Sequence, residues 1–296
     1  MIEFKEIALE DKALFDSYFS YKNYENSEFT FTNNFIWRDA YHFRYAIIQD
    51  HLCIMGKYRN RYPFIFAPLS LNTPAYDLVM PALVDVFHQK GYPLIMKSVT
   101  KDAKEAIEAV MPKSIIFKED RSNHDYVYSS KDLIDLSGKM YRQKRNHVNK
   151  FIKSYNFEYE VIDENNINEC LDIEKTWAEK RNGDKSILEE KKAILELMAN
   201  FHALKITGGA LRINGTIQSF TLGELLNPDM AVIHIEKANI DYDGCYAMIN
   251  QQFAMNAWSH ITLINREEDM GIPGLRKAKE SYYPTKMIVK YTGFFL

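Results

Sequence analysis

The stretch 209–225 is the clearest guide to the fold, and it reads Gly209-Ala210-Leu211-Arg212-Ile213-Asn214-Gly215-Thr216-Ile217-Gln218-Ser219-Phe220-Thr221-Leu222-Gly223-Glu224-Leu225. Two β-type runs flank Asn214-Gly215. Such a pair is the strongest short-range signal for a two-residue hairpin, because both residues tolerate the left-handed backbone conformation that the turn requires. The segment 231–238, rich in β-branched residues, is expected to add a third strand. The stretch therefore predicts an antiparallel meander.

Helical patterns surround the predicted meander. Three precede it, at 140–153, 167–180 and 188–202. A loop, a helix, a strand, a short helix and a last strand follow it, at 241–245, 246–258, 261–264, 275–281 and 287–291. This order of elements is similar to that of the GNAT N-acyltransferase fold.

The first half of the chain shows a looser version of the same order. At 296 residues the chain is long for one core, and the polar, turn-rich segment 119–125 indicates a boundary near residue 130. We expect an α/β (α+β) protein with two GNAT-like domains in tandem, 1–130 and 131–296. Each would have a mixed, mainly antiparallel sheet flanked by helices, and the second would carry the active site.

Composition excludes several classes of protein. A net charge of −3 argues against a general affinity for polyanions. The three cysteines form neither a disulfide framework nor a zinc pattern, and the eight histidines lack metal-ligand spacing, so we expect no metal. No apolar run is long enough to span a membrane, and the N-terminus lacks a signal peptide, so we expect a cytoplasmic protein without integral membrane association.

The most basic stretch of the chain is 138–153. Its candidate ligand-binding residues are Arg142, Lys144, Arg145 and Asn149, with Lys139, Lys150 and Lys153 around them. Lys139, Arg142 and Lys150 fall close together on a helical wheel, whereas Lys144 points elsewhere. Either the helix presents a solvated basic face, or it binds an anion such as a CoA diphosphate, a tRNA backbone or a lipid headgroup.

The loop 241–246 occupies the position at which GNAT enzymes bind the pyrophosphate of acyl-CoA. Gly244 and Tyr246 are the candidate binding residues there, since backbone N–H groups and a helix N-terminus attract phosphate. Asp241 and Asp243 depart from that pattern, because carboxylates repel a pyrophosphate. The usual mode of CoA binding is therefore in question.

Glu236 lies in the predicted strand 231–238. Regular alternation would place Glu236 and His234 on one face of the strand, opposite Ile233 and Ile235. This pattern indicates either a polar pocket wall that holds a general base or the solvent-facing side of an antiparallel sheet.

Charge is concentrated in the stretch 265–284, which holds four acids and four bases between two apolar strands. The short helix would present Arg276 and Lys279 on one face, near a reacting carbonyl or a donor phosphate. In this reading Glu236 or Asp269 removes the acceptor's proton, and Tyr282 returns one to the leaving group. Alternatively, the acids pair with neighbouring bases, among them Arg276, and only lock the loop.

Two motifs resemble a known family. Gly138-Lys139-x₅-Arg145-x₃-Asn149 and Gly274-Leu275-Arg276-x₂-Lys279-x₄-Pro284 are similar to motifs of the soluble C-terminal domain of bacterial phosphatidylglycerol lysyltransferases, and more closely of its stand-alone relatives. The resemblance covers nearly the whole chain. It implies a tandem GNAT fold, an aminoacyl-tRNA donor, a lipid hydroxyl acceptor in the membrane enzymes, and a site role for Lys279. Glu280 to Pro284 departs from the lipid enzymes, which usually carry a second Lys and a Phe there.

These observations predict an acyltransferase or aminoacyltransferase. It would move a group from acyl-CoA or aminoacyl-tRNA, without a tightly bound cofactor, to an amine or hydroxyl on a small-molecule or lipid-like acceptor. The alternative is a non-catalytic module that keeps the fold and binds a phosphate-bearing ligand. In either case tRNA is a candidate partner. The sequence leaves the donor, the acceptor and the oligomeric state open.

Overall fold

The computed structural model describes residues 2–180 and 185–296 and divides the chain into two compact units. The first unit comprises the residues up to Asp125 with Glu268–Ile272 and Ile288–Leu296. The second comprises Tyr126–Glu267 and Pro273–Met287. A second domain continuous from 131 to 296 is therefore not observed, because two late segments return to the first unit.

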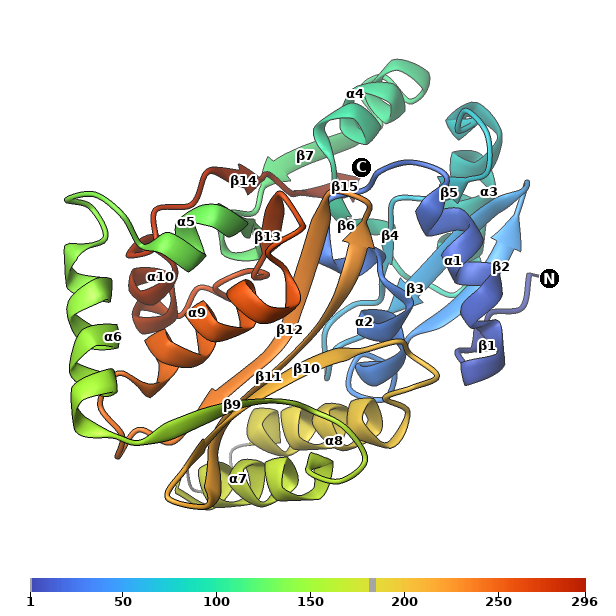
Figure 1. The fold of residues 1–296 in the computed structure, drawn as a ribbon. Coiled ribbons are helices and arrows are strands. Elements are labelled where there is room, and N and C mark those ends of the chain that lie inside the picture. Colours follow the sequence, from blue (N-terminus) through green and yellow to red (C-terminus); the bar gives the residue numbers. More distant parts are fainter. Residues whose placement is uncertain (1, 181–184) are drawn as a thin grey trace. The chain divides into compact units, whose positions relative to one another are not determined.

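The first unit contains a sheet in the order β1-β2-β3-β4-β6-β15-β7, with β5 paired to β3 (Figure 1). Its strands are β1 (Lys5–Glu6), β2 (Arg44–Ile48), β3 (His51–Gly56), β4 (Phe64–Phe66), β5 (Leu69–Ser70), β6 (Ile95–Val99), β7 (Ile115–Glu119) and β15 (Tyr291–Phe295). Its helices are α1 (Lys12–Ser20), α2 (Phe31–Ile36), α3 (Tyr76–Gln89) and α4 (Lys101–Val110). In this sheet β4 and β6 pair in parallel, and the pairings β1–β2, β2–β3, β3–β4, β3–β5, β6–β15 and β7–β15 are antiparallel.

The predicted last strand, 287–291, is in fact the end of one strand and the start of another. β14 (Lys286–Ile288) belongs to the sheet of the second unit, and β15 pairs with β6 and β7 in the first. Lys290, between the two strands, is fully buried and lies 2.7 Å from Asp125 and 2.6 Å from Glu28. Such pairing across the length of the chain leaves no local pattern in the sequence.

The second unit contains a sheet in the order β14-β8-β13-β12-β11-β10-β9. Its other strands are β8 (Asp125–Ser129), β9 (Phe157–Val161), β10 (Thr207–Ile213), β11 (Thr216–Asn227), β12 (Met230–Ala238) and β13 (Leu263–Asn265). Its helices are α5 (Ser130–Asp135), α6 (Arg142–Ser154), α7 (Ile167–Lys180), α8 (Lys185–Ala199), α9 (Cys245–Ala257) and α10 (Pro273–Glu280). The pairing β12–β13 is parallel, and the meander β9 to β12 is antiparallel.

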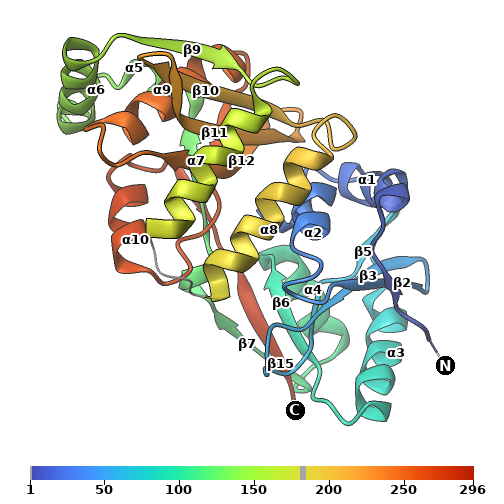
Figure 2. The same cartoon turned by 90° about the horizontal axis from the view of Figure 1, so that it is seen from below.

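Helices cover both faces of this second sheet. α9 packs against β10, β11 and β12, with α5 and α6 beside it, while α7 and α8 lie on the opposite face (Figures 1 and 2). The buried residues of α9 are mostly apolar, among them Met248, Ile249 and Phe253, and these form one core with Ala231 and Ile233 of β12. The expected mixed α/β architecture with two mainly antiparallel sheets is confirmed.

Two local predictions in this unit are also confirmed. Ile213 pairs with Thr216 across the two-residue turn, in which Asn214 and Gly215 have φ values of +50° and +84°. Positive φ at both central residues is the type I′ geometry that matches the twist of a hairpin. The short helix predicted at 275–281 is α10, displaced by one or two residues.

Candidate functional site

Charged and aromatic side chains gather in the second unit where four parts of the chain meet. We call this group the Arg266 cluster; its members are Tyr126, Tyr128, Lys144, Glu236, Arg266, Lys279 and Tyr282. β8 supplies the first two tyrosines, α6 the lysine at 144, and β12 the glutamate. The chain between β13 and β14 supplies the rest.

Arg266 lies at the centre of the cluster. Its Nη2 donates to Oε1 of Glu236 at 2.9 Å, and its guanidinium carbon is 5.0 Å from the ring centroid of Tyr282 and 5.7 Å from that of Tyr128. Within the described part of the chain, its Nη1 is buried without a hydrogen-bond acceptor. A buried donor left unpaired is costly, so this nitrogen is suited to an oxygen of a bound molecule.

Glu236 does not have the expected arrangement. His234 is an extra residue in a β-bulge, since Ile235 pairs with Leu222 and Ile233 pairs with the next residue, Gly223. The bulge breaks the alternation of faces. Glu236 therefore lies on the α9 side, the side on which Ile233 is packed, and its Oε2 accepts from Asn250 of α9 at 3.2 Å.

Both oxygens of Glu236 thus accept hydrogen bonds, one from Arg266 and one from Asn250. These two contacts hold the carboxylate between Arg266 and α9 and leave each oxygen a second lone pair. In this geometry Glu236 orients the guanidinium of Arg266.

Lys144, on α6, is a partly exposed ionisable residue of the Arg266 cluster. Its Nζ lies 3.9 Å from the ring centroid of Tyr282. Burial, and then the positive charge of Arg266, lower its pKa to about 8, while Glu236 acts in the opposite direction. A substantial fraction of this amine is therefore neutral near physiological pH, as general acid–base catalysis requires.

Two hydrogen bonds hold Lys279 in the cluster, and Tyr282 lies close by. The Nζ of Lys279 donates to the carbonyl oxygen of Arg266 at 2.5 Å, and the hydroxyl of Tyr128 donates to the carbonyl oxygen of Lys279 at 2.9 Å. Burial raises the pKa of Tyr282 to about 12, so this phenol is neutral at physiological pH. Lys279 thus places a second positive charge beside Arg266.

The other expected catalytic residues are placed differently. Arg276 is half-buried on α10, one turn before Lys279. Asp269 belongs to the first unit, where it is fully buried, accepts from Arg121 at 3.2 Å and accepts from the backbone N–H of Gly271 at 2.8 Å. Its contacts are those of a residue that closes a turn.

The expected ligand-binding residues of α6 divide into two groups. The guanidinium of Arg145 donates to the carbonyl oxygens of Leu136 and Gly138, at 2.7 Å for the latter, and so satisfies the end of α5. Arg142 and Asn149 are exposed and are available to a ligand.

The carboxylate of Asp243, in the loop before α9, is paired with a lysine of α6. Asp243 lies 2.5 Å from the Nζ of Lys150, which offsets its charge. Gly244, the residue before α9, has φ +88°, and a Cβ there would lie 2.7 Å from the carbonyl oxygen of His147. Tyr246, in the first turn of α9, is exposed.

The sequence alone did not identify three features of this site. The central role of Arg266, the contribution of Tyr128 and the perturbed pKa of Lys144 all depend on distant segments meeting. The only local hint was Lys144 itself, which points away from the other bases of its helix. No group of three His, Cys, Asp or Glu side chains among the described residues is arranged to hold a metal ion. None of the described helices is both long and apolar enough to cross a membrane.

Two sheets of this kind in one chain, each flanked by helices, define a tandem GNAT-like, acyltransferase-like fold. A tandem GNAT protein from the clavulanic acid biosynthesis pathway has this fold, with a TM-score of 0.51 at 8% identity over 99% of this chain and 98% of its own. The L-PGS structure from Bacillus licheniformis aligns with a TM-score of 0.69 at 15% identity, over 98% of this chain and 93% of that one.

The chain belongs to the family described as phosphatidylglycerol lysyltransferase, C-terminal, whose model matches residues 19–294. A conserved protein of unknown function from Bacteroides thetaiotaomicron is similar over the full length of both chains. Its crystal structure has a TM-score of 0.93 at 35% sequence identity.

Proposed function

We propose that this protein transfers an acyl or aminoacyl group from a CoA thioester or an aminoacyl-tRNA to an amine or hydroxyl acceptor. Membership of a family named for lysyl transfer supports the reaction class. The observation that carries the proposal is Lys144, an amine with a pKa of about 8 beside a buried arginine that has an unpaired donor.

In the proposed reaction the acceptor's nitrogen or oxygen attacks the acyl carbon. The neutral amine of Lys144 takes the proton that the acceptor loses. The bond from the acyl carbon to the donor's sulfur or ribose oxygen then breaks, and Lys144 returns the proton to that leaving atom. Each step conserves charge within the site.

The negative charge that develops on the acyl oxygen would be stabilised by Nη1 of Arg266, with Lys279 adding positive charge. Preorganised donors of this kind in a dry site usually supply the largest part of the rate enhancement. Glu236 has the role of orienting Arg266, through the 2.9 Å ion pair. Arg276 and Tyr282 remain candidates for positioning the donor.

For the donor's phosphates we propose Arg142, Asn149 and the N-terminal turn of α9 with Gly244 and Tyr246. Both side chains on α6 are exposed, and the unpaired N–H groups of a helix N-terminus attract phosphate. Acyl-CoA and aminoacyl-tRNA share phosphate chemistry, so this surface is compatible with either donor. The tyrosine rings of the Arg266 cluster are compatible with a lipid-like or small-molecule acceptor.

Thermal-shift titration and a transfer assay test this proposal together. We expect either acetyl-CoA or aminoacyl-tRNA to raise the melting temperature, because a ligand that binds only the native state stabilises it. Radiolabelled acyl or aminoacyl group should then appear on a primary amine or a hydroxyl acceptor. Donor binding without transfer to any of a panel of acceptors would identify a non-catalytic binding module, and no binding of either donor would contradict the proposal.

A further inference from the structure

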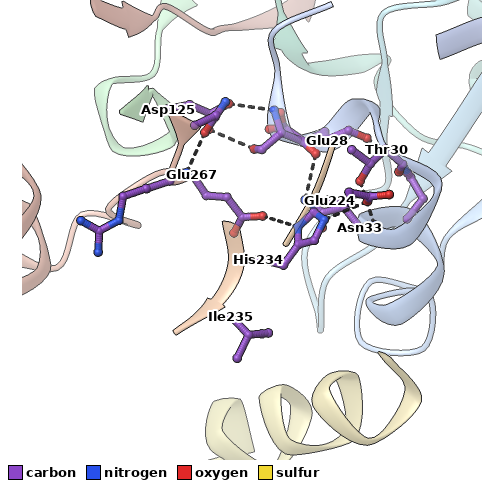
Figure 3. Close-up of polar contacts among 12 residues, drawn as sticks. Glu28, Thr30, Asn33, Asp125, Glu224, His234, Ile235 and Glu267 are labelled. Carbon is purple, nitrogen blue, oxygen red and sulfur yellow. Dashed lines mark hydrogen bonds and ion pairs between the residues drawn. The ribbon is translucent and has the colours of Figure 1, made fainter. Parts of the chain in front are cut away.

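His234 is a fully buried histidine that the proposed reaction does not use. It is the extra residue of the β-bulge in β12, and its side chain is 1% exposed. Its Nε2 lies 2.9 Å from Oε1 of Glu224, and its Nδ1 lies 2.9 Å from Oε1 of Glu267 (Figure 3). The bulge directs the ring towards both carboxylates.

Two carboxylates require two ring N–H donors, so the geometry is that of an imidazolium. Burial, which lowers the pKa of a histidine, is outweighed by the hydrogen bonds and charges of Glu224 and Glu267, and the pKa of His234 is raised to about 9. Glu224 on β11 and Glu267 after β13 are the charged groups that bond it. The imidazolium is therefore fully formed at neutral pH.

Glu224 and Glu267 lie in different backbone environments. Glu224 lies on β11 and pairs with Val232 of β12, between two shifts of register. Glu267 follows Arg266 directly, and its φ of +56° is a left-handed conformation that non-glycine residues rarely adopt. Its N–H donates to Oδ1 of Asn265 at 2.7 Å. A strained residue of this kind persists only where its surroundings hold it.

We propose that His234 is a positioning residue, whose imidazolium holds Glu267 and thereby keeps Arg266 directed at Glu236 and Tyr282. Three contacts carry the inference: His234 to Glu267, Arg266 to Glu236, and Lys279 to the carbonyl oxygen of Arg266. The first contact fixes the side chain of Glu267, and the other two fix the side chain and the backbone of Arg266. The role in catalysis rests on the proposed function, whereas the mechanical link does not.

The test uses Lys144 as a reporter, because the charge of Arg266 lowers its pKa. NMR titration of the full chain, with ¹³C-labelled lysine and the Lys144 signal assigned from Lys144→Arg, measures that pKa without any substrate. In His234→Gln we expect Arg266 to move away and the pKa of Lys144 to rise by about 0.5 or more, towards the ordinary value near 10.4. Glu267→Gln should give a shift in the same direction.

Glu224→Gln is the matched control, since it removes the other carboxylate of His234 and leaves the link to Arg266 in place. We expect its Lys144 pKa to stay within about 0.2 of the wild-type value. An unchanged pKa in Glu267→Gln overturns the proposal, even if His234→Gln fails to fold. A shift in Glu224→Gln as large as that in Glu267→Gln also overturns it, because the cluster would then be a general structural element. If the titrations agree but no acyl transfer is found, the link stands and the proposed function fails.

Discussion

Two buried ionic groups, one in each unit, differ in how completely their members are paired. The Lys290 cluster of the first unit consists of Ser27, Glu28, Asp125 and Lys290, and the ammonium at its centre has two carboxylates and a hydroxyl within 3.4 Å. The Arg266 cluster of the second unit contains an arginine with an unpaired donor and a partly exposed lysine of lowered pKa.

The comparison separates a structural group from a reactive one. In the Lys290 cluster the carboxylates raise the pKa of the ammonium, so its charge is permanent. In the Arg266 cluster burial and a like charge lower the pKa of Lys144 to about 8, so its charge is adjustable near neutral pH. We therefore expect the Lys290 cluster to support the fold and the Arg266 cluster to bind a ligand or react.

The largest expected effect is on stability, from Lys290→Met. Removing the ammonium leaves Glu28 and Asp125 buried without their cation, which should lower the free energy of unfolding by about 3–5 kcal/mol. Denaturant unfolding measures the change, with the exposed Lys5→Met as control. Adding Asp125→Asn should recover part of the loss. A decrease below about 1 kcal/mol would show that the cluster is not structural.

The next effect is the pH dependence of stability due to His234. Its pKa is raised to about 9 in the folded state, above the ordinary value near 6.5. Its stabilisation is therefore complete below pH 6.5 and is lost as the pH rises through 9. The stability difference between wild type and His234→Gln should shrink by about 3 kcal/mol between pH 6 and pH 10. Urea unfolding at both pH values measures it, and a constant difference would contradict an imidazolium in the folded protein.

Lys144→Met should lower turnover by on the order of 10²-fold, about 2.7 kcal/mol, without loss of the fold. In the wild type, kcat/KM should rise with pH through an apparent pKa near 8, because the neutral amine is the active form. The matched control is Lys131→Met, which changes an exposed lysine of α5. Near-normal turnover in Lys144→Met would assign the proton transfer to another group, with Glu236→Gln and Lys279→Ala as the next variants to assay.

The smallest effect is expected for Gly244→Ala. The left-handed backbone at this position and the nearby carbonyl of His147 both oppose a Cβ, so we expect a loss of about 1–3 kcal/mol. Gly138→Ala is the matched comparison, because it has a similar φ of +79° but no atom within 4 Å of the added carbon. Equal losses in the two variants would show that backbone strain alone, and not the contact with α6, sets the requirement for glycine.

Local features of the chain were determined by the sequence itself. The Asn214-Gly215 turn and helix α10 were predicted close to where the structure has them, because turn and helix signals depend on the conformational preferences of adjacent residues. The motifs around Arg145 and Lys279 likewise sufficed to indicate the family.

Only the tertiary structure decided which charged side chains are paired within the protein and which can bind a ligand or react. The sequence does not show that the guanidinium of Arg145 binds the end of α5, or that Lys144, one residue earlier, faces Tyr282 and Arg266. Nor does any pattern reveal that Lys290 joins the first unit or that a bulge turns His234 towards Glu267. The pairings of His234 with Glu267 and of Lys290 with Asp125 join residues 33 and 165 positions apart, and a pKa depends on the charges and solvent that such residues bring together or exclude.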